Sequence, residues 1–275
     1  MTTAHARPTL LALVVALVAT FGLATTPAAQ AAPQWADAAD ATITPGVQMF
    51  TDGAQCTANF IFTQGSDVLI GYAAHCAGTG GSTDTNGCDA GSLPIGTPVE
   101  IDGATQPGTL AYSSWAEMAA RGETNADACN YNDFALVRIH PDDHDLVNPS
   151  VPVIGGPVAL GGATAAGEQV YNYGNSSLRL GLSPLSPKTG VSLGTSGNGW
   201  THTVYTVTPG IPGDSGSGFL DSDGNAFGVT STVAIAPLAA SNGISDLALG
   251  LAYANADGDQ DYTLVPGTEA FVGYP

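Results

Sequence analysis

A serine stands in the glycine-rich segment Gly213-Asp214-Ser215-Gly216, where its hydroxyl could act as a nucleophile. A serine hydroxyl is weakly nucleophilic, so it needs a general base, a group that orients the base, and donors for the oxyanion that attack creates. Glycine permits tight turns in which neighbouring amide N–H groups point at one place, so this segment could also supply the donors. Taken alone, the segment could equally be a hairpin turn, because Gly, Asp and Ser are common turn residues.

Two upstream segments contain a candidate base and a candidate acid to orient it. His75 lies in Ala73-Ala74-His75-Cys76, directly after a mostly apolar run, and Asp133 opens a stretch with the alternating pattern of a strand. An imidazole can take the serine proton, and a carboxylate can hold the imidazole in the right tautomer. The remaining histidines are weaker candidates. His5 lies in the N-terminal leader, His140 and His144 lie in a Pro- and Asp-rich linker, and for His202 we expect a surface or packing role.

Together the three segments resemble the catalytic segments of the chymotrypsin-like (trypsin-fold) serine proteases of the secreted bacterial type. That family places its histidine in Ala-Ala-His-Cys, its aspartate in Asp-x-Ala-Leu and its serine in Gly-Asp-Ser-Gly, and the same order occurs here as His75, Asp133 and Ser215. Other serine hydrolases order these residues differently. The resemblance implies a serine endopeptidase in which the N–H groups of Gly213 and Ser215 form the oxyanion hole. An esterase with the same triad and a catalytically idle binding protein of this fold are the alternatives.

Composition favours an all-β protein with many turns. The chain has 36 glycines and 18 prolines among 275 residues, its alternating segments are short, and no long segment beyond the leader has helical periodicity. The resemblance implies two six-stranded antiparallel β-barrels with the active site in the cleft between them. The predicted strands are 47–50, 56–63, 68–73, 97–101, 109–115, 134–139, 169–173, 178–182, 201–207, 218–220, 226–232 and 247–253.

The first residues have the pattern of a secretory signal peptide. Arg7 precedes the apolar stretch Leu10–Ala19, and Ala29-Gln30-Ala31 is a typical cleavage site. We therefore expect a signal peptide at 1–31, a short tail at 32–42, an N-terminal barrel at 43–145 and a C-terminal barrel at 146–275. The signal peptide predicts a secreted protein, and because no later segment is long and apolar enough to span a membrane, we expect the mature protein to be soluble.

The acidic composition argues against several partners. The formal net charge is −19, so nucleic acids and anionic membranes are poor partners. We expect protein or peptide substrates and a monomer. We expect no cofactor: two acidic clusters, 221–225 and 255–261, have oxygen ligands at alternate positions that could suit calcium, but turns are favoured for both.

Four cysteines in a secreted protein predict two disulfides, for which three pairings are possible. The resemblance implies a Cys56–Cys76 bridge that holds the histidine loop, which would leave Cys88 to pair with Cys129. A metal site on these cysteines is not expected, since no Cys-x-x-Cys spacing occurs.

The partner of Asp214 is open at the level of sequence. In many members of the resembled family this acid pairs with an amino terminus freed by cleavage, and the segment that begins at Ile43 resembles such a mature start. The bacterial branch commonly uses an internal arginine, for which Arg179 is the candidate. Local backbone amides alone are the third possibility.

The resemblance also suggests which residues form the specificity pocket. Pro209 occupies the position at which trypsins carry an acid, Ser231 matches the serine that supports the aspartate, and Val233 stands where a glycine would leave a deep slot. Glutamate-specific relatives would carry a histidine at the position of Thr230. We therefore predict an uncharged pocket that prefers small or medium apolar side chains.

Overall fold

Short antiparallel β-strands make up most of the regular structure in this computed structural model, which describes residues 1–4, 33–81, 85–234 and 240–274, without the side chains of Val233 and Ala234. Residues 32–275 form one compact unit. The predicted signal peptide therefore lies outside the described residues apart from its first four. The strands are β1 (Gln48–Thr51), β2 (Ala54–Thr57), β3 (Ile61–Gln64), β4 (Asp67–Tyr72), β5 (Pro98–Ile101), β6 (Gly108–Ser113), β7 (Ala135–Arg138), β8 (Gln169–Tyr173), β9 (Pro187–Ser196), β10 (Thr201–Thr206), β11 (Gly218–Leu220), β12 (Ala226–Ala234), β13 (Ser241–Asp246) and β14 (Thr263–Leu264).

The first half of the chain forms a sheet with the strand order β14-β3-β4-β7-β6-β5-β1-β2. β2 and β3 are the two halves of one bent strand. The bend stays paired on both sides, because Ala58 N donates to Val47 O at 2.9 Å and Asn59 N donates to Gly71 O at 2.8 Å. This bent strand closes the sheet into the expected six-stranded barrel, and β14 is an additional strand that pairs with β3.

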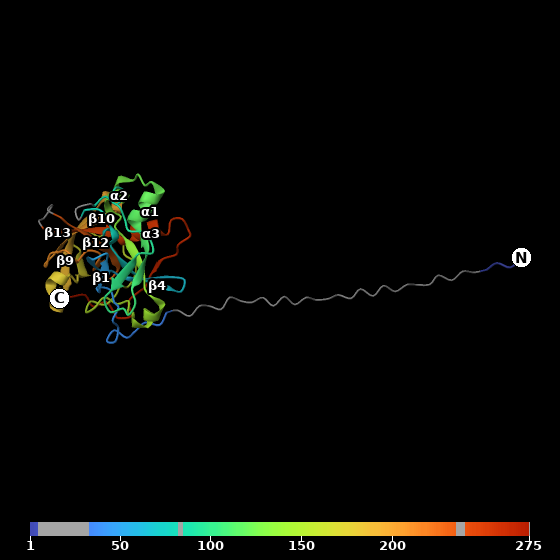
Figure 1. Cartoon of the computed structure of the whole chain (residues 1–275), viewed down its shortest axis with the longest axis horizontal. Coiled ribbons are helices and arrows are strands. Elements are labelled where there is room, and N and C mark those ends of the chain that lie inside the picture. Colours follow the sequence, from blue (N-terminus) through green and yellow to red (C-terminus); the bar gives the residue numbers. More distant parts are fainter. Residues whose placement is uncertain (5–32, 82–84, 235–239, 275) are drawn as a thin grey trace. The chain divides into compact units, whose positions relative to one another are not determined.

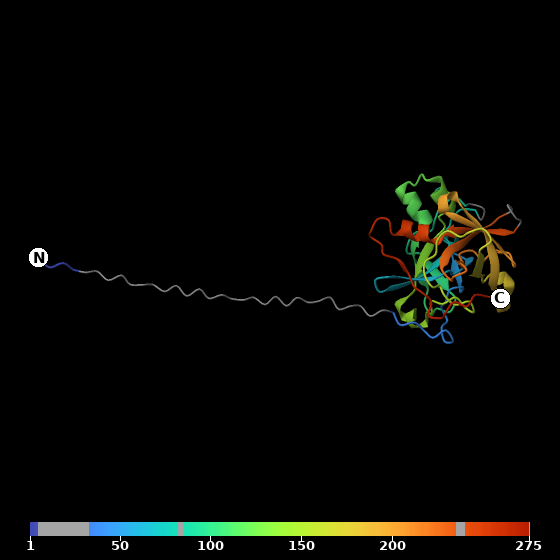
Figure 2. The same ribbon diagram turned by 180° about the vertical axis from the view of Figure 1, so that it is seen from behind.

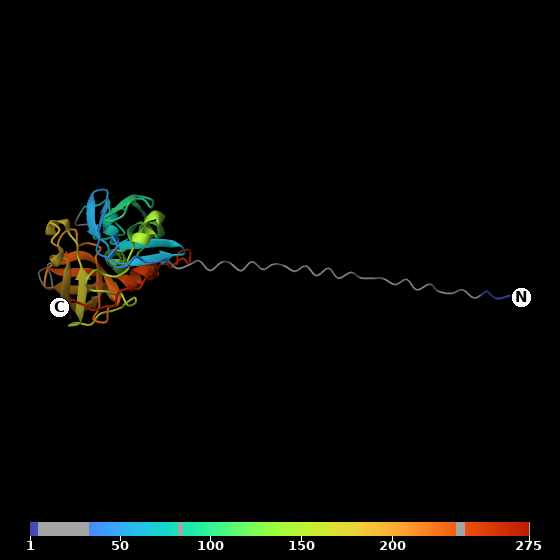
Figure 3. The ribbon, with the colours of Figure 1, turned by 90° about the horizontal axis from the view of Figure 1, so that it is seen from below.

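The second half forms a closed six-stranded barrel in the order β10-β13-β12-β11-β8-β9. Figure 3 shows the two halves as adjacent masses, with the blue-to-green first half beside the yellow-to-red second half. All strand pairs in both sheets are antiparallel, and the two-barrel, all-β prediction is thereby confirmed.

Two predicted strands are wrong. Residues 178–182 begin in the 3-10 helix Ser177–Arg179 (η3) and turn at Leu180, which has a φ of 55°. Residues 247–253 fall in the helix α3 (Leu247–Ala254), because the Asp246 side chain accepts a hydrogen bond from Leu249 N and starts a helix there. In both segments leucines alternate with other residues, which is the pattern expected of a strand. The second barrel is completed by β9 and β13 instead.

Further helices are short and lie in connections. They are α1 (Ser114–Arg121), α2 (Ala126–Tyr131) and the 3-10 helices η1 (Ala74–Ala77), η2 (Pro141–Leu146), η4 (Ser183–Leu185) and η5 (Gly197–Gly199). In Figure 1 and in the reverse view of Figure 2, the green α1 lies beside the red α3. Among the helices that the structure describes, none has the length and apolar character needed to cross a membrane.

The apolar core is divided into a large and a small cluster of buried side chains. One cluster contains most buried apolar side chains of the first barrel, including Phe60, Phe62, Tyr72 and Phe134, whereas the second barrel has a smaller cluster of Val170, Val204, Phe219, Phe227 and Ile244. Polar residues such as His202 and Asn172 are also buried in the second half.

Candidate active site

His75 and Asp133 form a close pair at the ends of neighbouring strands. His75 lies in η1, which begins one residue after β4, and Asp133 lies two positions before the first residue of β7, which pairs with β4. His75 Nδ1 is 2.6 Å from Asp133 Oδ2, and the backbone N–H of His75 donates to Asp133 Oδ1 at 2.8 Å. This double contact fixes both the imidazole ring and the carboxylate.

Asp133 is held from the second barrel as well. Ser231 Oγ donates to Asp133 Oδ2 at 2.6 Å, and Asp133 N donates to Ser245 Oγ at 3.1 Å. Burial by itself would raise the pKa of Asp133, but the charge of His75 and the hydrogen bonds from His75 and Ser231 hold it below its ordinary value. Asp133 therefore stays ionised beside the imidazole.

The pKa of His75 is shifted in the complementary direction. Burial disfavours the imidazolium and lowers the pKa, while the adjacent Asp133 carboxylate and its hydrogen bond raise it more strongly. The net effect is a pKa above the ordinary 6.5. Such an imidazole is a stronger base than a free histidine and can store a proton taken from a neighbour.

Ser215 lies in the turn that the sequence singled out, between β10 and β11. Gly213 and Gly216 have φ values of 96° and 86°, so glycine is required at both ends of the turn. Ser215 Oγ makes no hydrogen bond to any described residue, and its backbone carbonyl accepts from Thr57 N at 2.8 Å. Catalytic hydrogen bonds are often loose before substrate binds, so the free hydroxyl is compatible with a nucleophile.

The backbone N–H groups of the serine turn differ in whether they have a hydrogen-bond acceptor among the described residues. Ile211, Asp214, Gly216 and Ser217 all donate their N–H groups to acceptors within the protein. Among the described residues, no acceptor is bonded to the N–H groups of Gly213 or Ser215. The two amides that the sequence suggested for an oxyanion hole are thus the two that are free to bind a ligand oxygen.

A cleft of about 670 Å³ brings these groups together. His75, Asp133 and Ser215 all line it, and Trp115 of α1 closes one side, with its ring centroid 6.3 Å from that of His75. Cys56 and Cys76 also line the cleft and form one disulfide, and Cys88 pairs with Cys129, so the expected disulfides are confirmed. The Cys56–Cys76 bridge links β2 to η1. The Cys88–Cys129 bridge links the segment between η1 and β5 to α2, which precedes Asp133.

The three residues suggested for the specificity pocket differ in their position relative to the cleft. Ser231 lines the cleft, with Thr230 and Thr232 on either side of it. Pro209 is not among the lining residues, although the next residue, Gly210, is. The side chain of Val233 lies outside the described residues. Among the described lining residues, the only acidic or basic side chains are those of His75, Asp133 and Asp214, each of which already has a partner.

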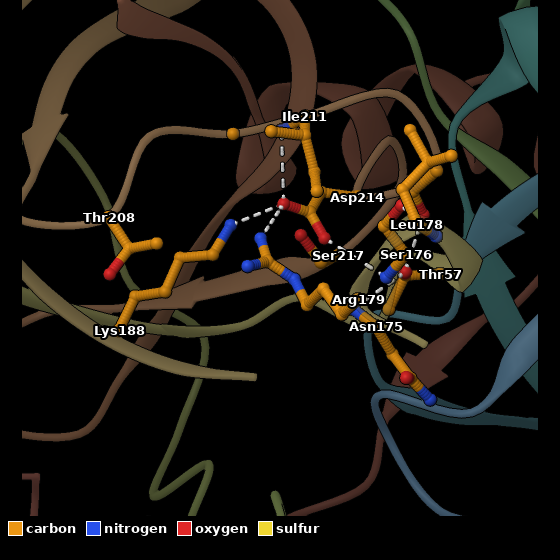
Figure 4. A network of polar contacts seen from close by, with 12 residues as sticks. Thr57, Asn175, Ser176, Leu178, Arg179, Lys188, Thr208, Ile211, Asp214 and Ser217 are labelled. Carbon is orange, nitrogen blue, oxygen red and sulfur yellow. Dashed lines mark hydrogen bonds and ion pairs between the residues drawn. The ribbon is translucent and has the colours of Figure 1, made fainter. Parts of the chain in front are cut away.

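Asp214 is buried beneath the turn, with 1 % of its side chain exposed. Arg179 Nη2 lies 2.5 Å from Asp214 Oδ2, so the Arg179 pairing considered from the sequence is formed (Figure 4). Local amides contribute as well, since Ile211 N donates to Oδ2 at 3.1 Å and Ser176 N to Oδ1 at 3.2 Å. Ile43, the candidate amino terminus, is buried elsewhere, and its N–H donates to Leu146 O.

Sequence reasoning missed two polar contacts of the second barrel. Lys188 on β9 places its Nζ 2.6 Å from Asp214 Oδ2, and the only sequence signal was that Lys188 is one of four cationic side chains beyond the leader. His202 is fully buried, and its Nε2 lies 2.9 Å from Asp246 Oδ2. His202 is therefore a packing residue with polar partners rather than a surface residue.

The two acidic clusters are organised by protein contacts. In 221–225, the Asp221 carboxylate accepts from the N–H groups of Asp223 and Asn225, and in 255–261, Asp257 pairs with Arg121. His75, Cys56 and Cys76 place potential ligand atoms within 4.8 Å of one another, but both sulfurs belong to a disulfide and cannot act as thiolate ligands.

No protein-family model and no curated protein matches this sequence. Solved structures do match. Protease A of Thermobifida fusca is 19 % identical with a TM-score of 0.54, and the alignment covers 82 % of this chain and 100 % of that one. A Nocardiopsis protease (17 % identical, TM-score 0.50; 81 % and 98 % covered) and a glutamic acid specific serine protease (15 %, 0.50; 81 % and 100 %) are similar too. The chain thus shares the fold of bacterial chymotrypsin-like serine proteases.

Proposed function

We propose that this protein is a secreted serine endopeptidase that hydrolyses peptide bonds through an acyl-enzyme. The observation that supports this best is the meeting of three features in one cleft: the His75–Asp133 pair, the hydroxyl of Ser215, and two amides of the same turn. Neither the hydroxyl nor the two amides have a hydrogen-bond partner among the described residues. A nucleophile, an oriented base and oxyanion donors are the parts that acyl transfer needs.

In the proposed mechanism, Ser215 Oγ attacks the carbonyl carbon of the substrate while His75 Nε2 accepts the hydroxyl proton. Asp133 holds Nδ1–H and stabilises the imidazolium, and the N–H groups of Gly213 and Ser215 bind the oxyanion. His75 then gives its proton to the departing amine, which leaves an ester on Ser215. Water attacks this ester with His75 again as the base, and the carboxylic acid product and the free serine are released.

For the substrate, we propose small or medium apolar side chains at the cleaved residue. The described lining offers no unpaired charge for a Lys, Arg or Glu side chain, and Thr230 rather than histidine precedes Ser231. We further propose that residues 1–31 are removed on secretion and that barrels of residues 43–145 and 146–275 contribute the two sides of the site. Amino-terminal sequencing of protein recovered from the medium should begin at residue 32.

Covalent labelling tests the proposal. A fluorophosphonate should label the wild-type protein on Ser215, and labelling should be lost in Ser215→Ala and in His75→Ala but kept in Ser222→Ala, a control in an exposed turn. Digestion of a peptide library, read by mass spectrometry, should then give cleavage after small or medium apolar residues. Folded protein that is not labelled would support the idle binding protein, and labelled protein that cleaves only esters would support the esterase.

A further inference from the structure

Two cationic side chains share one buried carboxylate beneath the serine turn. Arg179 Nη2 and Lys188 Nζ both contact Asp214 Oδ2, at 2.5 and 2.6 Å, and the three side chains are 5 %, 3 % and 1 % exposed (Figure 4). Salt bridges that are buried are usually balanced in charge, because an uncompensated buried charge is strongly unfavourable. Here the three groups carry one positive charge in excess.

Arg179 does not hold the carboxylate by itself. An arginine that clamps a carboxylate normally donates two parallel hydrogen bonds. Arg179 donates to Asp214 through Nη2 alone, and its Nε has no partner among the described residues. Lys188 therefore shares with Arg179 the charged contacts that orient Asp214, and the two cations come from different elements, β9 and η3.

The orientation of Asp214 in turn affects the direction in which the N–H groups of Gly213 and Ser215 point. Asp214 lies between Gly213 and Ser215, and its carboxylate also accepts the N–H groups of Ile211 and Ser176. A rotation of the carboxylate toward Arg179 alone would break or lengthen these bonds and shift the peptide units on both sides of Asp214. Oxyanion stabilisation depends on donors within a few tenths of an ångström of their working positions.

We propose that Lys188 is a positioning residue for the oxyanion hole: its buried ammonium group holds the Asp214 carboxylate so that the amides of Gly213 and Ser215 point into the cleft. This inference rests on the proposed function. It assigns Lys188 a role in the rate of the acyl-transfer step, and none in contact with substrate.

The charge balance gives this role a distinctive signature. Removal of one partner of a buried ion pair is destabilising mainly because the other charge is left uncompensated. Replacement of Lys188 by methionine removes the excess positive charge and leaves Asp214 paired with Arg179, so no uncompensated charge remains. The protein should thus keep its stability while it loses activity. A residue that only supported the fold would lower both together.

The ionisation of Lys188 gives a second signature. Burial lowers the pKa of Lys188, and the charge of Arg179 lowers it further against the attraction of Asp214. Among the described residues, Asp214 and Arg179 are the charged groups that act on it, and Asn172, its register partner on β8, does not titrate. Loss of its proton should loosen Asp214, so kcat should fall on the alkaline side before the protein unfolds.

The experiment compares Lys188→Met with Val191→Met, which introduces the same residue at an exposed position of the same strand. For Lys188→Met we expect kcat on a peptide substrate to fall by about 10²-fold, the typical effect of one lost oxyanion donor, with KM changed by less than about 3-fold. The midpoint of urea unfolding should be unchanged or higher. Lys188→Ala should regain part of its kcat when propylammonium is added.

A folded Lys188→Met protein whose kcat matches that of Val191→Met would overturn the inference, as would a parallel loss of kcat and stability without rescue by propylammonium. If neither Lys188 variant folds, the wild-type enzyme decides: kcat that stays constant up to the pH of unfolding would overturn the inference. A wild-type protein that neither hydrolyses peptides nor labels on Ser215 would instead refute the proposed function.

Discussion

Among the described residues, two histidine–aspartate pairs have a nitrogen–oxygen distance below 3 Å, and they differ in their surroundings. His75 and Asp133 face a cleft, and 26 % of the His75 side chain is exposed. His202 is fully buried, its Nδ1 is shared between the hydroxyls of Thr164 and Thr195, and Asp246 also starts α3. Only the first pair can reach a substrate, so residue type and contact distance do not by themselves indicate catalysis.

Asp133→Asn should lower kcat by about 10⁴-fold, because the amide cannot stabilise the imidazolium or fix the same tautomer. Activity requires neutral His75, so the acid limb of the wild-type pH–rate profile should lie above the 6.5 of a free histidine. In Asp133→Asn this limb should move to lower pH, since burial still disfavours the charged ring while the carboxylate that raised the pKa is gone.

Asp143→Asn is the matched control for this prediction. Asp143 is also fully buried in the first half, but it accepts hydrogen bonds from Thr105 and Gln106 and does not line the cleft. Its replacement should leave the position of the acid limb unchanged. The measurement is kcat/KM between pH 4 and 9, and an acid limb at the same pH in Asp133→Asn and wild type would contradict the assigned role.

At the scale of elements, short connections between strands carry the site, and the strands themselves fix where these connections meet. η1 follows β4, Asp133 precedes the neighbouring β7, and the serine turn lies between β10 and β11. The link from β8 to η3 contains Gly174, which passes close to the ion cluster. A Cβ at Gly174 would lie 2.6 Å from Asp214 Oδ1 and 2.8 Å from Lys188 Nζ.

Gly174→Ala should therefore disturb the ion cluster and lower both stability and activity. A clash in a tightly packed site typically costs about 1–3 kcal/mol. Gly162→Ala is the control, since a Cβ there has no atom within 4 Å, and it should unfold at the wild-type denaturant concentration. Urea unfolding followed by fluorescence measures both. Equal midpoints for the two variants would show that the cluster can move aside.

At the scale of the whole molecule, the chain combines a strongly acidic surface with a few buried carboxylates that must stay ionised. The formal net charge is −19, yet the pKa values of Asp133, Asp143 and Asp214 are all lowered in the fold. In each case burial opposes ionisation, and hydrogen bonds or neighbouring cations outweigh it. Protonation at low pH thus reduces the repulsion between surface carboxylates, but it also removes the charge that the buried carboxylates need for their hydrogen bonds and ion pairs.

The buried carboxylates, rather than the surface charge, should determine how the free energy of unfolding changes at low pH. A carboxyl group whose pKa is lowered by folding stabilises the protein above its unfolded pKa, and this contribution is lost as the pH falls through the folded value. The free energy of unfolding should thus decrease below about pH 4, near the ordinary pKa of aspartate. Asp143→Asn should make this decrease less steep.

The measurement is urea unfolding at a series of pH values in about 0.15 M salt, where repulsion between distant surface charges is largely screened. Stability that rises steadily from pH 6 to pH 3 would show that relief of surface repulsion prevails.

The sequence by itself determined the features that depend on local chemistry. Through their resemblance to the catalytic segments of chymotrypsin-like proteases, Gly-Asp-Ser-Gly, Ala-Ala-His-Cys and Asp-x-Ala-Leu predicted which residues meet in the cleft. β8 and β11 begin and end where the local pattern indicated. Short alternating strands and frequent glycine predicted the all-β fold. These features could be predicted because a turn or a half-buried strand imposes its residue pattern over a few neighbouring positions.

Only the tertiary structure decided which elements α3, β9 and β13 would be, and which groups surround Asp214. Leu247–Ala254 alternates like a strand, but its side chains pack as a helix behind the cap of Asp246, while β9, rich in Gly, Ser and Thr, completes a barrel. Lys188 and Arg179 reach one carboxylate from separate elements, and Asp133 is held by Ser231 and Ser245 across the cleft. Such contacts join residues 26 to 112 positions apart, and no local pattern specifies them, because their partners are chosen by the closure of the barrels.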